Sequence, residues 1–118
     1  MPRLAWLLPA VLWAVAIAFL SLRPKGVGGG PAGLDKVLHA GAYAGLAWLI
    51  SWGMGVRRWA ALAACALLAA AFGAGIEVAQ ATWVPGRSGE VADGVANLAG
   101  ALVAVVLFGL FSSKDRIE

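Results

Sequence analysis

The sequence predicts an all-α polytopic membrane protein, a compact bundle of four transmembrane helices. Hydrophobic residues make up 62% of the chain and charged residues only 13%, a balance that a water-soluble globule does not have. Nearly every residue also lies in one of four long apolar segments or in a short connection between them. Because no stretch is left for a soluble domain, residues 1–118 are expected to form a single membrane domain.

The first apolar segment, residues 4–22, predicts a membrane-spanning helix, because about 20 apolar residues cross the core of a bilayer. A cleaved signal peptide is the alternative, since Ala16, Ile17 and Ala18 fit the small-residue pattern before a cleavage site. The segment is long for a signal peptide, and its removal would leave an odd number of helices. We therefore expect a span, followed by a glycine- and proline-rich connection over residues 23–33.

The second segment, residues 35–53, predicts a helix that begins at Asp35. An aspartate directly after a glycine-rich connection can accept hydrogen bonds from the first free amides of a helix, so capping is its simplest role. Asp35, His39 and Tyr43 recur every four residues. They are therefore expected along one stripe of this helix.

The third and fourth segments, residues 59–81 and 91–111, complete the four expected helices. Small residues recur every four positions in both, which suits close helix packing in lipid. The rows are Ala66, Ala70 and Ala74 in the third segment, and Ala96, Gly100 and Ala104 in the fourth.

Basic residues near the helix ends predict the orientation in the membrane, because cytoplasmic loops are rich in Lys and Arg. One side holds Arg3, Arg57, Arg58, Lys114 and Arg116, and the other holds Arg23, Lys25, Lys36 and Arg87. If acidic partners hold Lys36 and Arg87 within a site, the imbalance favours cytoplasmic termini. We therefore expect a multi-pass protein of the cytoplasmic membrane with both termini inside.

This topology brings the start of the second helix, the end of the third and the start of the fourth to one membrane face. His39, Glu77 and Asn97 each lie roughly 6 to 9 Å inside their helix ends, at about 1.5 Å rise per residue, so they share a depth. An unpaired charge inside a bilayer is costly, and Lys36 and Arg87 are the available counter-ions. The expected polar cluster comprises Asp35, Lys36, His39, Tyr43, Glu77, Gln80, Arg87, Asp93 and Asn97.

At these residues the sequence resembles the VanZ-like family of small bacterial membrane proteins. The matching motifs are Asp35-Lys36-x-x-His39-x-x-x-Tyr43, Glu77-x-x-Gln80, Pro85-Gly86-Arg87 and Asp93-x-x-x-Asn97-x-x-Gly100. One departure is Ala40, where the family often has Phe. The resemblance implies a role at the cell envelope and a link to glycopeptide antibiotic resistance, but no settled reaction.

The polar cluster allows three functions. Lys36 and Arg87, with amide donors from Gln80 and Asn97, suit a phosphate or pyrophosphate, which at head-group depth points to an envelope lipid or lipid-linked phosphate. Alternatively, His39 acts as the acid or base of an enzyme on such a lipid. In the third reading the cluster is structural: Glu77 pairs with Arg87, and Asp93 and Asn97 tie the fourth helix to the second.

Other site classes fit the sequence poorly. A metal site of His39, Glu77 and Asp93 is conceivable, but one histidine beside two cations is poor zinc chemistry, so we expect no metal and no cofactor. No basic run is long enough for nucleic acid. Cys65 is the single cysteine, which excludes an intrachain disulfide. Membrane lipids are therefore the expected partners.

Overall fold

A computed structural model describes residues 3–22, 34–83 and 91–112, and these ranges are helical apart from the short turns at helix ends. A short 3-10 helix, η1 (Arg3–Leu7), leads into α1 (Leu8–Ser21), followed by α2 (Leu34–Met54), α3 (Trp59–Trp83) and α4 (Val91–Ser112). No strand occurs in the described ranges. The predicted all-α class is confirmed, with all four helices close to their expected bounds.

The first helix differs from its expectation, because residues 3–7 form a 3-10 helix and the α-helix begins only at Leu8. Pro9 stands in the first turn of α1. A proline has no N–H to donate to the carbonyl four residues earlier, so it is accommodated at the start of an α-helix rather than inside one.

Within the described residues, three segments are long and apolar enough to cross a membrane: Leu4–Ser21, Trp59–Trp83 and Val91–Ser112. The polar side chains of α2, among them Lys36 and His39, lower its hydropathy. This helix also contacts η1, α1, α3 and α4. A helix covered by neighbours on several sides needs less apolar surface than one facing lipid. The membrane character is thus supported by three helices, and α2 packs against each of them.

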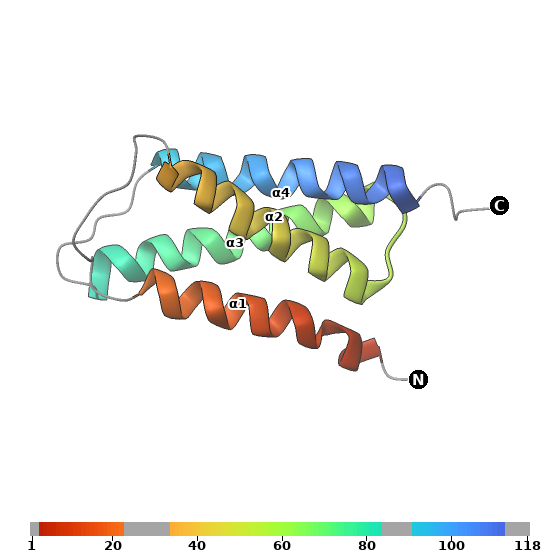
Figure 1. The fold of residues 1–118 in the computed structure, drawn as a ribbon, viewed down its shortest axis with the longest axis horizontal. Helices are drawn as coiled ribbons and strands as arrows, with labels where there is room; N and C mark the ends of the chain where they lie inside the picture. Colours follow the sequence, from red (N-terminus) through yellow and green to blue (C-terminus); the bar gives the residue numbers. More distant parts are fainter. Residues whose placement is uncertain (1–2, 23–33, 84–90, 113–118) are drawn as a thin grey trace.

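The chain order places three helix ends together (Figure 1). The start of α2, the end of α3 and the start of α4 lie at one end of the bundle, and the start of α1 and the end of α4 lie towards the other. This is the arrangement that the topology argument predicts. The two helices that pack most extensively are α2 and α4, and Gly100 of α4 lies directly against the backbone of Ala40.

The small-residue row expected on α3 is wrong in part. Ala66 is buried, but Ala74 is exposed. The face that packs instead carries Leu62, Ala66, Ala69, Gly73, Ile76 and Gln80. Four residues turn a helix by about 400°, so a strict four-residue row drifts around it, whereas alternating steps of three and four hold one face.

Candidate functional site

An ion pair joins α2 to α4 at the end of the bundle where three helix ends meet. The Nζ of Lys36 lies 2.7 Å from Oδ1 of Asp93, with side-chain exposures of 38% and 11%. Asp93 is buried in the first turn of α4. Its carboxylate is therefore compensated at the edge of the apolar interior, as the cost of an unpaired charge there requires.

His39 lies one turn further along α2 and contacts the same helix. Its Nδ1 is 3.1 Å from Oδ1 of Asn97, and its Nε2 is 3.6 Å from Oδ2 of Asp93. An amide oxygen only accepts hydrogen bonds, so Nδ1–H donates to Asn97. In the neutral ring the lone pair is then on Nε2, which faces Asp93.

Glu77 adds a third helix to this group. It is half-buried on α3, and one ligand atom each from His39, Glu77 and Asp93 lie within 4.8 Å of one another. The predicted common depth of His39, Glu77 and Asn97 is consistent with these contacts. We call Lys36, His39, Glu77, Asp93 and Asn97 the polar cluster from here on.

Tyr43 and Gly73 lie close together, and Gly73 also lies close to Asn97 of the polar cluster. Tyr43 is 2% exposed, and a Cβ added at Gly73 would lie 3.0 Å from its Cε1 and 2.8 Å from Nδ2 of Asn97. Gly73 therefore makes room for both side chains. Gly73 was not among the predicted site residues. A glycine four positions before Glu77 on the same helix nevertheless indicates a place where a neighbouring helix can approach closely.

Gln80 also connects α3 to α1. Its Nε2 donates to the backbone oxygen of Ser21 at 2.8 Å, which ties α3 to the end of α1. A second bond joins α1 to α2, because Nε1 of Trp13 donates to the oxygen of Ala42 at 2.8 Å. The first helix is thus held by one hydrogen bond near its middle and one at its end.

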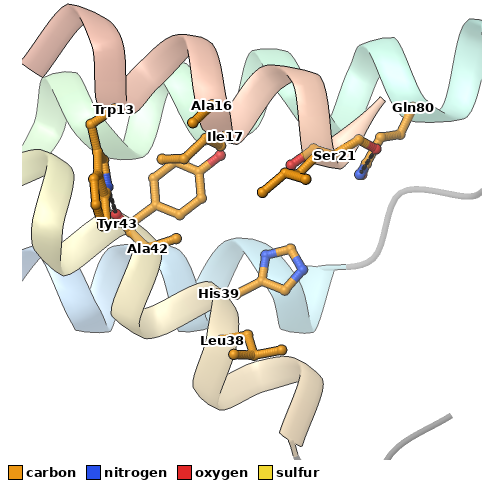
Figure 2. Close-up of a pocket in the computed structure, with 10 residues that line it drawn as sticks. Trp13, Ala16, Ile17, Ser21, Leu38, His39, Ala42, Tyr43 and Gln80 are labelled. Atoms are coloured by element: carbon orange, nitrogen blue, oxygen red, sulfur yellow. Dashed lines mark hydrogen bonds between the residues drawn. The ribbon is translucent and has the colours of Figure 1, made fainter. Parts of the chain in front are cut away.

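A cavity of about 470 Å³ lies between α1, α2 and α3. Its lining is mostly apolar, with polar side-chain atoms from five residues, and consists of Trp13, Ala16, Ile17, Leu20, Ser21, Leu38, His39, Ala42, Tyr43 and Gln80. Figure 2 shows the rings of His39 and Tyr43 projecting from α2 towards α1. Its size is that of a small-molecule pocket. The sequence did not reveal the contribution of α1, since its lining residues resemble any lipid-facing residues.

Two of the expected site residues are not placed by the structure. Arg87 lies outside the described residues, and so does the side chain of Asp35. The predicted pairing of Arg87 with Glu77 involves a residue outside the described part of the chain and stays a prediction.

No family model, curated protein or solved structure matches this chain. The resemblance to the VanZ-like family therefore rests on the sequence motifs alone.

Proposed function

We propose that this chain is a VanZ-like integral membrane protein of the bacterial cell envelope that binds an envelope lipid or lipid-linked phosphate. The observation that carries the proposal is the cavity, because its walls suit an amphipathic molecule. Trp13, Ile17 and Leu20 offer apolar surface to a hydrocarbon chain, while His39 and Gln80 offer polar atoms to a head group. Pockets of this kind orient a ligand with few polar contacts in a mostly apolar lining.

The polar cluster supplies recognition of the phosphate in this proposal. Lys36 has a partly exposed side chain, and an ammonium carries three donor protons. His39 links the cluster to the cavity, since it lines the cavity and also contacts Asn97. Arg87, the second cation of the sequence motif, would add a planar guanidinium suited to phosphate oxygens.

The proposal includes the orientation in the membrane. All four helices cross the cytoplasmic membrane, both termini are cytoplasmic, and the polar cluster lies at the head-group depth of the outer leaflet. The basic residues Arg57 and Arg58, between α2 and α3, then face the cytoplasm, as the distribution of Lys and Arg in membrane proteins favours. A contribution to glycopeptide antibiotic tolerance is part of the same proposal. Deletion of the gene should then lower the glycopeptide concentration that inhibits growth, and an unchanged inhibitory concentration would contradict this part.

An enzymatic role is the second candidate, and the orientation of one ring favours it. Asn97 orients the ring of His39 through Nδ1, and His39 lines the cavity, so its imidazole can serve as an acid or base towards a bound lipid. In that case His39→Ala abolishes turnover of a lipid phosphate while the protein stays folded. Unaltered turnover would remove this candidate. A purely structural cluster predicts instead that Glu77→Gln and Arg87→Gln lower stability without any ligand-dependent effect.

Binding of defined lipids to the purified full chain in nanodiscs tests the proposal. We expect a polyprenyl phosphate to bind and the matching polyprenol, which lacks the phosphate, to bind at least tenfold more weakly. Lys36→Gln and Arg87→Ala should weaken binding of the phosphate form, whereas Arg57→Gln, at the opposite end of the bundle, serves as the matched control for loss of a cation. Equal binding of both lipids, or affinity unchanged in Lys36→Gln and Arg87→Ala, would contradict the proposal.

A further inference from the structure

We infer that His39, Glu77 and Asp93 bind one divalent transition-metal ion, of the class of Zn²⁺ or Mn²⁺. The three residues come from α2, α3 and α4, and a ligand atom of each lies within 4.8 Å of the others. One imidazole with two carboxylates is a donor set of borderline hardness, which suits these ions better than thiolate-seeking or purely oxygen-seeking metals.

The spacing between His39 and Asp93 fits an ion better than it fits a hydrogen bond. Their Nε2 and Oδ2 atoms are 3.6 Å apart, beyond the roughly 3.2 Å at which N–H···O bonds usually end. Two ligands about 2.1 Å from a tetrahedral zinc ion lie about 3.4 Å from each other. The observed separation is therefore close to that of two atoms that share one ion.

The surroundings of the imidazole also match a metal ligand. A ligating histidine normally donates its second ring N–H to an oxygen, which fixes the tautomer and the ring orientation. Asn97 provides this oxygen 3.1 Å from Nδ1. In the neutral ring Nε2 is consequently the nitrogen without a proton, and it is the one that faces Asp93.

The nearby ammonium does not block the position. Lys36 contacts Oδ1 of Asp93, whereas the oxygen nearest His39 is Oδ2. The two oxygens of one carboxylate can thus serve Lys36 and an ion separately. Lys36 therefore does not occupy the oxygen that faces His39.

Charge favours a cation at this place. Glu77 and Asp93 bring two negative charges within 4.8 Å of His39 and of each other. Lys36 compensates one of these charges at Oδ1 of Asp93, and a divalent ion between the two carboxylates would reduce the repulsion that remains between them. His39 also lines the cavity, so three protein ligands would leave a coordination position open towards it.

Metal binding by the purified full chain in detergent tests this inference. The protein carries a histidine-free affinity tag, is stripped with a chelator, and is titrated with Zn²⁺ or Mn²⁺ while bound metal per chain is measured. We expect one ion per chain, and binding at least tenfold weaker in His39→Gln and Glu77→Gln. Cys65→Ala is the matched control, because it removes the chain's single thiol and should retain the ion.

A second readout needs no variant. The chain has one histidine, so pulsed electron paramagnetic resonance of Mn²⁺-loaded wild type should reveal a nitrogen coupling that can come only from His39 among the imidazoles. Absence of bound ion, equal affinity in His39→Gln, loss of the ion in Cys65→Ala, or absence of the nitrogen coupling would each overturn the inference. No lipid is added in these experiments and the metal itself is what is measured, so their failure is distinct from failure of the lipid proposal.

Discussion

The Nζ of Lys36 and Oδ1 of Asp93 lie 2.7 Å apart across the contact between α2 and α4. This ion pair stands beside the buried Asn97 and the ring of His39. The Asp93 carboxylate thus faces two residues of α2, Lys36 through Oδ1 and His39 through Oδ2. These contacts join α2 to α4 at this end of the bundle.

Removal of both charges of this pair should destabilise the protein by less than the two single removals added together. Asp93→Asn and Lys36→Gln are each expected to cost about 1–3 kcal/mol, because the remaining charge loses its charged partner in a partly buried site. The double variant should cost less than the sum. Thermal unfolding in detergent of the four proteins of this double-mutant cycle gives the coupling. Additive effects would show that the pair contributes nothing.

Gly100 should be irreplaceable where another glycine of the same helix is not. A Cβ at Gly100 would overlap the carbonyl of Ala40, whereas one at Gly94 meets nothing within 4 Å. We expect Gly100→Ala to destabilise the fold by about 1–3 kcal/mol, through forced separation of α2 and α4. Gly94→Ala should be neutral or stabilise by up to about 1 kcal/mol. Equal melting temperatures for the two variants would contradict the close approach.

Gly73 and Gly75 make a second matched pair, on α3. A Cβ at Gly73 would press on Tyr43 and Asn97, and a Cβ at Gly75 meets nothing within 4 Å. Gly73→Ala should therefore weaken binding of both lipid phosphate and metal ion, by displacing the side chain that orients His39. Gly75→Ala should bind as wild type does. If both variants bind normally, Asn97 does not position the ring.

The attachment of α1 should depend on Gln80. Loss of the hydrogen bond from its Nε2 to the oxygen of Ser21 in Gln80→Leu is expected to cost about 1 kcal/mol. Hydrogen exchange should then speed up in the last turn of α1 and remain unchanged in α4. Unchanged exchange in α1 would mean that the contact with Trp13 alone holds this helix.

The fold was largely predictable because hydropathy sets where membrane helices begin and end. The residues that would gather were also predictable, since helix order and depth bring His39, Glu77 and Asn97 to one level. The partner of Lys36 was not predictable, because Glu77 and Asp93 on two other helices were both candidates. How far each helix is rotated about its axis decides that Lys36 contacts Asp93. Residue spacing along one helix says nothing about the rotation of its neighbour.

The cavity could not be predicted at all. Its apolar wall comes from α1, where Ile17 and Leu20 have the same character as the residues that face lipid. Only the packing of α1 on α2 and α3, fixed by Trp13 and Gln80, distinguishes the two faces. Such a cavity depends on three-dimensional shape and leaves no residue pattern.

Binding of a lipid phosphate in the cavity can be tested by native mass spectrometry of the lipid that co-purifies with the protein. Ala16 lines the cavity, while its neighbour Val15 is exposed. Wild type and Val15→Trp should retain one phosphate-bearing lipid per chain, and Ala16→Trp, which places a bulky ring in the cavity, should lose it. Retention of the lipid by Ala16→Trp, or its absence from wild type, would show that the cavity does not bind a lipid phosphate.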